Sequence, residues 1–151
     1  MADLTEALQR LVDEAEIKRL GLGYAQAVDR RDAAALTALF TPDGIIESLG
    51  VERRGHEQIG RIPARLDRLY DRTYHTVFNQ TVAVDGDAAE GEVYSTAHHL
   101  KRQDDGRTSD HVMAITYRDR YVRTDSGWRF AERRLDLQWT QTAFVEVADK
   151  V

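Results

Sequence analysis

The stretch from Gly23 to Phe40, GYAQAVDRRDAAALTALF, places a single acid, Asp29, where one helix ends and another begins. The apolar side chains before this acid recur at the three- and four-residue spacing of an α-helix: Ile17, Leu20, Gly21, Tyr24, Ala27 and Val28. Beyond it, Asp32 is expected to cap a short helix that Pro42 brings to an end. The chain is therefore organised around an acid at a junction between helices.

Upstream of this stretch, leucine and valine side chains repeat at helical spacing and predict a separate helix over residues 4–12. Asp13 and Glu16 resemble a capping box, in which acid side chains accept hydrogen bonds from the free backbone N–H groups of a helix N-terminus. The helix that carries Asp29 is thus predicted to begin at Asp13. Three helices would precede the first strand.

Downstream, the pattern becomes one of strands and turns. A strand from residue 44 ends at Gly50, GVERRG is a candidate hairpin, and residues 59–69 form a further helix in which Pro63 lies in the first turn or causes a kink. Four long strands follow, joined by turns of Asp and Gly, over residues 74–84, 89–101, 109–123 and 128–142. Helices followed by an antiparallel meander predict an α+β fold, a cone-shaped barrel with N-terminal helices packed into a strongly curved, mainly antiparallel sheet.

The composition limits the possible functions. The 151 residues fit a single domain, residues 1–151, and the absence of cysteine excludes disulfides and thiolate zinc sites. The first ten residues lack the apolar run of a signal peptide, and the sequence has no apolar stretch of roughly 18 residues to span a membrane. A net charge of −5 argues against nucleic-acid binding, which needs a basic surface. We expect a soluble, cytoplasmic protein whose arginines at 53–54 and 133–134 are mostly solvated.

The order of elements and four motifs resemble the SnoaL-like branch of the nuclear transport factor 2-like superfamily. The motifs are YAQAVDRRD (24–32), FTPDGIIES (40–48), YHTVFNQTVAVDGDAAEG (74–91) and SGWRFAERR (126–134), and the likeness covers nearly the whole chain. Its members include scytalone dehydratase, lindane dehydrochlorinase and bile-acid dehydratase, and some members only bind ligands. The resemblance implies a ligand cavity between helices and sheet, but a fold of many activities does not give the function.

In the dehydratase and dehydrochlorinase members an Asp at the end of the long helix orients a His at the start of a central strand, and Asp29 and His75 match these positions. The resemblance implies that neutral His75 is the base, while the Asp29 carboxylate fixes its tautomer and stabilises the imidazolium. Such proton abstraction needs no metal and no organic cofactor. The residues alone leave another interpretation open. Asp29 lies about 140° from the apolar stripe on a helical wheel, which predicts a solvated acid, and His75 would then be a core histidine.

Strand alternation supplies further candidates. On residues 89–101 one face carries the smaller side chains that suit a cavity, Val93, Ser95, Ala97 and His99. His99 falls close to a second catalytic histidine of scytalone dehydratase. Alternatively, His98 or His99 packs in an oligomer interface. A metal site of His98, His99 and His111 is disfavoured, because a carboxylate at supporting spacing is missing.

Two more candidates are Arg133 and Tyr24. Arg133 is the charged member of a row on the last strand that otherwise holds Ala131, Leu135, Leu137 and Trp139. Its guanidinium would hold Asp29, a substrate oxygen or a developing anion, or else form an intersubunit salt bridge. Lindane dehydrochlorinase has an arginine at the matching position. Tyr24 would polarise a substrate carbonyl or pack as a core aromatic.

Two hypotheses of different class follow. The first is a cofactor-independent lyase of dehydratase or dehydrohalogenase type, or a related isomerase, acting on a small hydrophobic, cyclic substrate. The second is a non-catalytic ligand-binding or assembly protein of the same fold. An epoxide hydrolase ranks last, because the sequence offers no second inward Asp to join Asp29 and Arg133. A homo-oligomer, dimer or trimer, is expected through apolar residues that one subunit cannot cover: Tyr121, Phe130, Phe144, Val145 and Val147.

Overall fold

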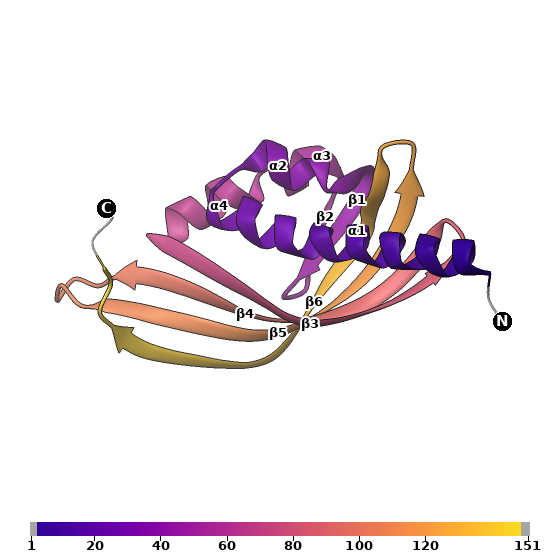
Figure 1. Cartoon of the computed structure of the whole chain (residues 1–151). Helices are drawn as coiled ribbons and strands as arrows, with labels where there is room; N and C mark the ends of the chain where they lie inside the picture. The colour runs from indigo at the N-terminus through magenta and orange to yellow at the C-terminus, as the bar shows by residue number, and fades with distance from the viewer. Residues whose placement is uncertain (1–2, 149–151) are drawn as a thin grey trace.

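The computed structural model describes residues 3–148, which form four helices and a six-stranded sheet (Figure 1). The helices are α1 (Leu4–Asp29), α2 (Ala33–Ala38), α3 (Gly55–Ile59) and α4 (Ile62–Leu69). The strands are β1 (Phe40–Ser48), β2 (Val51–Arg54), β3 (Arg72–Asp85), β4 (Ala88–Arg102), β5 (Thr108–Thr124) and β6 (Gly127–Val145).

The strands lie in the order β2-β1-β6-β5-β4-β3, and neighbours are antiparallel except β1 and β6, which run parallel. The helices cover one side of this long curved sheet (Figure 1). The predicted α+β fold is therefore confirmed, together with the hairpins that join β3 to β6. Gly86 and Gly127 adopt φ of 59° and 94° in two of these turns, a conformation that favours glycine.

The short elements between α1 and β3 agree with the sequence in most respects. Asp32 caps α2, and its side chain accepts a hydrogen bond from the Ala35 N–H at 2.9 Å. GVERRG contributes β2, which pairs with β1, although β1 begins at Phe40 and not at residue 44. The one helix predicted over 59–69 is instead two. Pro63 lies in the first turn of α4, where its missing N–H costs no helical hydrogen bond.

Helix α1 is continuous, so the predicted break at Asp13 is wrong. Residues 4–20 contain neither Gly nor Pro, and the helical hydrogen bonds therefore continue through Asp13. The N-cap is Asp3, whose side chain accepts a hydrogen bond from the Thr5 N–H. Asp13 lies inside the helix, and its carboxylate is buried against the sheet.

The buried Asp13 carboxylate fastens α1 to the β5–β6 hairpin. Arg123 donates two hydrogen bonds to it, both 2.8 Å long, and the indole N–H of Trp128 donates a third at 3.1 Å. The hydrogen bonds from Arg123 lower the pKa of Asp13 from 3.8 to about 2, although burial acts in the opposite direction. The early part of α1 is thus held by an ion pair and not only by apolar packing.

The core between helices and sheet is rich in aromatic side chains. Phe130 is fully buried and stacks on Phe40 with ring centroids 4.9 Å apart, and it lies 5.2 Å from the ring of Tyr121. A bulge explains this position, because the pairing of β5 with β6 shifts between Tyr121↔Phe130 and Arg120↔Glu132. The expectation that Ala131 faces inward and Phe130 outward is therefore wrong. Tyr121 and Phe130 belong to the core of one subunit and are not oligomer contacts.

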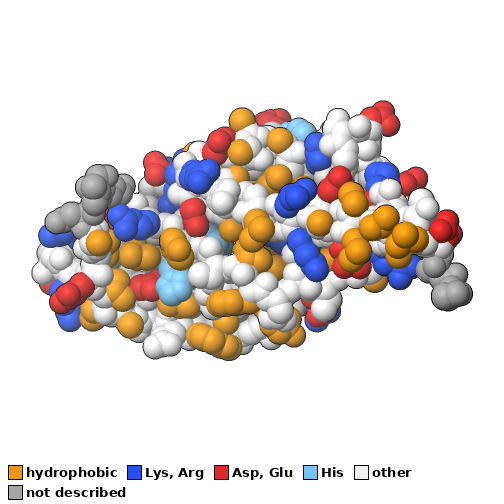
Figure 2. Space-filling model, in the orientation of Figure 1, with side chains coloured by type: hydrophobic (Ala, Val, Ile, Leu, Met, Phe, Trp, Pro, Cys, Tyr) orange, Lys and Arg blue, Asp and Glu red, His pale blue; other side chains and the backbone are white. Residues whose placement is uncertain are grey.

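Apolar side chains also remain exposed in several places, of which two bear on assembly. The N-terminal half of α1 presents Leu4, Leu8, Leu11 and Val12 to solvent, and Figure 2 shows hydrophobic side chains gathered over it. A second bulge in β6 turns Trp139 away from the row of Leu137, and Trp139 is 55% exposed, like Phe144 at 54%. Such surfaces suit contacts between subunits, and the homo-oligomer stays a prediction. Among residues 3–148, each helix is too short or too polar to cross a membrane.

Replacing Asp13 by Asn is expected to lower the free energy of unfolding by about 2 to 4 kcal/mol, because Arg123 loses its buried partner. Because the pKa of Asp13 is depressed to about 2, its contribution is complete above about pH 4 and is lost as the pH falls toward 2. Urea unfolding at several pH values measures both effects. The control is Glu14→Gln, since Glu14 reaches Lys18 only at 3.9 Å. An Asp13→Asn protein as stable as this control would contradict the assignment.

Candidate active site

A partly enclosed cavity of about 220 Å³ lies between the helices and the inner face of the sheet. Most of its lining is apolar and comes from α1, α4 and strands β1, β4, β5 and β6, and it includes Val28, Ile46, Ile62, Leu66, Leu69, Met113, Ile115 and Leu135. Four of the predicted site residues line it as well: Tyr24, His75, Ala97 and His99. A small number of polar groups in an apolar enclosure is the usual form of a small-molecule site.

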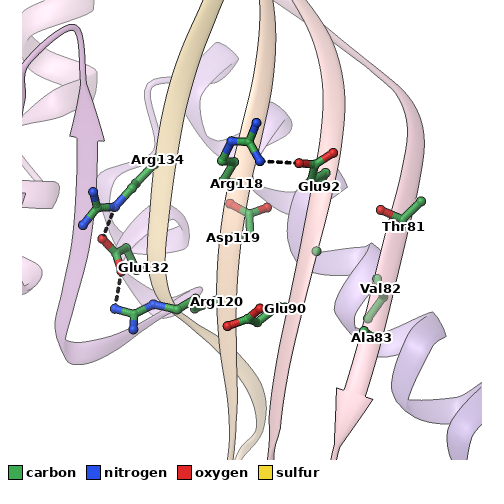
Figure 3. Close-up of a pocket in the computed structure, with 11 residues that line it drawn as sticks. Thr81, Val82, Ala83, Glu90, Glu92, Arg118, Asp119, Arg120, Glu132 and Arg134 are labelled. Atoms are coloured by element: carbon green, nitrogen blue, oxygen red, sulfur yellow. Dashed lines mark hydrogen bonds and ion pairs between the residues drawn. The ribbon is translucent and has the colours of Figure 1, made fainter.

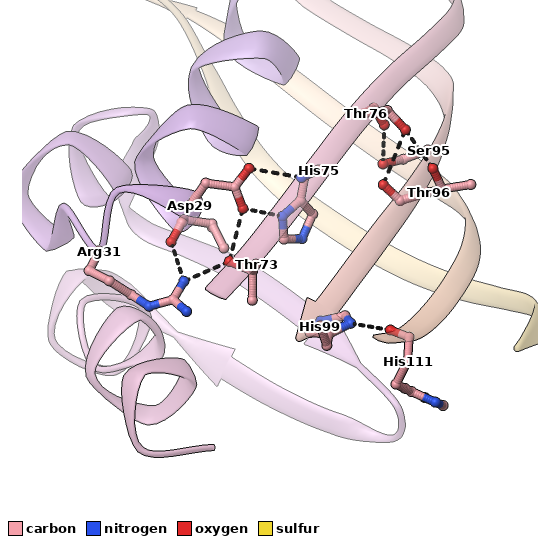
Figure 4. Close-up of polar contacts among 10 residues, drawn as sticks. Asp29, Arg31, Thr73, His75, Thr76, Ser95, Thr96, His99 and His111 are labelled. Carbon is pink, nitrogen blue, oxygen red and sulfur yellow. Dashed lines mark hydrogen bonds and ion pairs between the residues drawn. The ribbon is translucent and has the colours of Figure 1, made fainter. Parts of the chain in front are cut away.

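His75 lines this cavity, and its side chain contacts that of Asp29 (Figure 4). Asp29 is the last residue of α1, and His75 lies near the start of β3. The Nδ1 atom of His75 lies 2.6 Å from Oδ1 of Asp29, and the backbone N–H of His75 donates to Oδ2 at 2.8 Å. The side chains of both residues are largely buried. The interpretation of Asp29 as a solvated acid is wrong, because β3 runs beside the end of α1.

Two residues that the sequence did not single out hold Asp29 in place. The hydroxyl of Thr73 donates to Asp29 Oδ1 at 2.9 Å, and Arg31 Nη1 donates to that hydroxyl at 2.7 Å. Arg31 Nη1 also donates to the carbonyl of Val28 at 2.9 Å, and Arg31 has a φ of 59°. A non-glycine residue in the left-handed region is unusual, and here it turns the guanidinium back toward the helix end. In the sequence, the one signal for this contact is that Arg31 follows Asp29 by two residues in the motif DRRD.

This geometry selects one tautomer of His75. A carboxylate only accepts hydrogen bonds, so Nδ1 carries a proton and donates a hydrogen bond to Asp29, and in the neutral ring Nε2 carries the lone pair. Among the described residues, no group hydrogen-bonds Nε2, which points away from Asp29 (Figure 4). Burial raises the pKa of Asp29, but the hydrogen bonds from His75 and Thr73 outweigh it and keep that pKa below its ordinary value. Asp29 is therefore a carboxylate at neutral pH.

His99 presents a second imidazole to the same cavity. Its Nδ1 lies 3.0 Å from the backbone carbonyl of His111, so Nδ1 carries the proton here too (Figure 4). Its ring centroid lies 6.1 Å from that of His75 and 4.7 Å from the ring of Tyr70. Burial lowers the pKa of His99, and the neighbouring His75 acts in the same direction. His99 is thus suited to remain neutral.

The predicted strand face is confirmed, but only part of it reaches the cavity. Val93, Ser95, Ala97 and His99 are all buried, whereas His98 points to the opposite face and pairs with Asp110 at 2.6 Å. Ala97 and His99 line the cavity. Ser95 donates its hydroxyl to the carbonyl of Thr76 at 2.6 Å, and Val93 belongs to the hydrophobic core. Within residues 3–148, no three His, Asp or Glu side chains are grouped to hold a metal ion.

Arg133 is buried, but it does not hold Asp29. Its Nε and Nη2 donate to the two carboxylate oxygens of Asp119 at 2.9 and 2.7 Å, and its guanidinium lies 4.5 Å from the ring of Tyr24. Asp119 is the inward acid that the sequence did not reveal, and it also accepts a hydrogen bond from Tyr121. Arg133 does not line the cavity, and its guanidinium packs against the ring of Tyr24, which does. A catalytic role for Arg133 stays a prediction.

A larger hollow, of about 450 Å³, lies outside this cavity, across strands β3 to β6 (Figure 3). Most of its charged side chains form ion pairs with one another. Arg118 pairs with Glu92 at 2.5 Å, and Arg120 and Arg134 both bind Glu132. The hollow is open and lined largely by these ion pairs, and His75 and Asp29 are not part of its lining. The cavity that His75 lines is therefore the candidate active site.

The family model of the SnoaL-like domain matches residues 9–134 of this chain. The chain belongs to the SnoaL-like family. The uncharacterized protein Rv2910c of Mycobacterium tuberculosis is 29% identical over 129 residues, which cover 84% of this chain and 86% of that protein. An NTF2-like protein with a cystatin-like fold from Novosphingobium aromaticivorans is 29% identical, with a TM-score of 0.76 and 91% of each chain covered.

The SnoaL-like fold is shared with an enzyme of known name. Hexachlorocyclohexane dehydrochlorinase (LinA) type 2 superposes with a TM-score of 0.82 over 95% of this chain and 97% of its own. At 20% identity, this likeness shows the fold alone. The match of the SnoaL-like domain to residues 9–134 confirms the family predicted from the four sequence motifs.

Replacing His99 by Gln is expected to flatten the pH dependence of stability between pH 7.5 and 5.5. The depressed pKa of His99 means that the unfolded chain binds its proton more readily, so the folded protein loses stability as the pH falls below the ordinary histidine value of 6.5. Urea unfolding of wild type and variant at both pH values measures this slope. Equal slopes for the two proteins would show that His99 binds a proton as easily in the folded as in the unfolded chain, and would contradict this prediction.

Proposed function

We propose that this chain is a cofactor-independent lyase, in which His75 removes a proton from a carbon atom of a small, hydrophobic, cyclic substrate. One observation carries the proposal: the Asp29 carboxylate binds both the ring N–H and the backbone N–H of His75, and so directs the lone pair of Nε2 away from itself at the cavity wall. A protein that only encloses a ligand does not require an imidazole held in this way.

The reaction is an elimination. Nε2 of His75 takes the proton, the electron pair of the C–H bond forms a C=C bond, and a hydroxide or halide on the adjacent carbon leaves with its own electron pair. His75 becomes an imidazolium, which the Asp29 carboxylate stabilises at 2.6 Å. Without a leaving group, return of the proton to another carbon gives the related isomerase reaction. Each step uses groups of this chain alone.

The cavity supports this chemistry by its size and polarity. A volume of about 220 Å³ is below the 300 to 1,000 Å³ that is usual for drug-sized ligands, so the substrate is small. Apolar walls strengthen the attraction between Asp29 and the imidazolium, because the effective dielectric constant beside them is lower than in bulk water. The fold is also that of hexachlorocyclohexane dehydrochlorinase, an enzyme named for the elimination of chloride. Tyr24 and His99 would orient polar atoms of the substrate.

The direct test measures proton abstraction independently of the leaving group. Cyclic ketones are incubated with the protein in D₂O, and NMR follows deuterium exchange at the carbon next to the carbonyl. A panel of chlorinated cyclohexanes and cyclic β-hydroxy ketones then reports elimination, by halide release or by absorbance of the new double bond. We expect His75→Gln and Asp29→Asn to lower the catalysed rate by about 10²-fold or more, because they remove the base or its orientation.

The matched control is His98→Gln. His98 also pairs with a carboxylate at 2.6 Å, that of Asp110, but it lies on the opposite face of the sheet. Its replacement should leave the rate unchanged. Exchange and elimination that are equal in wild type and His75→Gln, or absent from both, would refute the lyase and favour a binding protein of the same fold.

A further inference from the structure

A second hollow, of about 310 Å³, adjoins the candidate cavity, because Arg53 and Arg65 line both. Its lining is strongly basic and consists of Arg53, Gln58, Arg61, Arg65 and Arg68. We call the four arginines of this lining the arginine arc. The lining contains no carboxylate side chain among the described residues, so the cavity opens beside a concentration of positive charge.

Most of the arginine arc lacks an anionic partner. Within residues 3–148, no carboxylate lies within 4.0 Å of Arg53, Arg65 or Arg68, whereas Arg61 pairs with Glu57. Arg53 donates one hydrogen bond, to the hydroxyl of Ser48 at 3.2 Å. The chain as a whole has a charge of −5, so composition does not explain this basic cluster. Guanidinium groups that converge repel one another unless an anion lies between them.

The secondary structure brings these arginines together. Arg61 immediately precedes α4, and Arg65 and Arg68 follow at intervals of four and three residues, which places them on one side of the helix. Arg53 comes from β2, which pairs with β1 at the edge of the sheet. Two separate elements therefore supply charge to one hollow. A merely solvated row of charges on α4 does not account for the contribution of Arg53.

We propose that Arg53, Arg65 and Arg68 bind an anionic group at one end of the substrate, a carboxylate or a phosphate, while its apolar part extends into the cavity toward His75. Guanidinium groups recognise both anions through paired hydrogen bonds. The inference rests on the proposed function, since it takes the cavity as the place where the substrate reacts. It narrows the substrate class from small hydrophobic molecules to small amphipathic anions.

The positive charge of Arg53 in the arginine arc acts on Tyr24 inside the cavity. Burial raises the pKa of the Tyr24 phenol, while the charges of Arg133 and Arg53 act in the opposite direction. Tyr24 and Arg53 both line the cavity, so a ligand that contacts one lies near the other. An anion bound at the arc is thus positioned by charge, and the rest of the molecule by apolar contact. This division would fix which carbon faces His75.

The experiment compares matched ligands by isothermal titration calorimetry. The probes are 3-cyclohexylpropanoate, its neutral amide and 2-cyclohexylethyl phosphate. Wild type should bind at least one anionic probe about tenfold or more tightly than the amide, and added salt should reduce this preference. The stronger of the two anions distinguishes a carboxylate substrate from a phosphate substrate. Equal affinity for all three probes would overturn the proposal without the need for any variant.

Variants then locate the anion. The double variant Arg53→Gln/Arg65→Gln should lose the preference for anions and keep its affinity for the amide. The single variant Arg65→Gln, at an exposed position, should lose part of the preference for anions. The control is Arg10→Gln, which removes the same charge from an exposed position early in α1. A preference that survives in the double variant, or falls equally in the control, would overturn the assignment.

The two proposals fail separately. His75→Gln should keep the preference for anionic probes, because His75 is not part of the arginine arc. An anion preference without any turnover that depends on His75 would leave the arginine arc standing and refute the lyase. Turnover of neutral substrates that depends on His75, without a preference for anionic probes, would support the lyase and refute the arginine arc.

Discussion

Two carboxylates of α1 fasten this helix to the sheet, and the position of the site depends on both. Asp13 binds Arg123 and Trp128 on the β5–β6 hairpin, and Asp29 binds His75 on β3. They are 16 residues apart, or about 24 Å along a helix that rises 1.5 Å per residue. With these two points fixed, the stretch of α1 between them lies over the curved sheet. The cavity forms between the end of this stretch, α4 and the inner strands.

Asp29 lies at the less favourable end of the helix for an acid. The C-terminus of an α-helix carries partial negative charge, which disfavours a carboxylate there. His75 and Thr73 compensate by donating hydrogen bonds, and Arg31 brings a positive charge to the same helix end. The arrangement would be an inefficient way to end a helix if stability were its only purpose. It suits the role proposed for His75, whose imidazole would gain and lose a proton.

The sequence predicted those features that depend on local chemistry. Gly86 and Gly127 marked the hairpins, because their turns need positive φ, and the alternation of residues 89–101 identified the face that carries Ala97 and His99. Features that depend on distant partners were missed. The helical wheel placed Asp29 in solvent, since it holds no information about β3, and only the family resemblance linked Asp29 to His75. Thr73 is 42 residues from the Arg31 that it meets.

Bulges were the other source of error. One extra residue near Ala131 exchanged the faces of β6 before it, so Phe130 entered the core. Arg133 kept its inward face but pairs with Asp119, its neighbour on β5, and not with Asp29. A bulge is specified by the pairing of two whole strands and leaves no short motif in one of them. The arginine arc was overlooked for a similar reason. Arg53 and Arg65 belong to different elements, and only folding brings them to one hollow.

The most direct test of His75 as a base is the protonation pattern of its ring, read from ¹⁵N NMR spectra of the imidazole nitrogens near neutral pH. Assignment by comparison with His75→Gln identifies its two signals. If His75 is the base that Asp29 orients, the ring is neutral with the proton on Nδ1 and a lone pair on Nε2, and Asp29→Asn loses this fixed tautomer. A proton on Nε2 in the wild-type protein, or a tautomer that Asp29→Asn does not disturb, would contradict this role of His75.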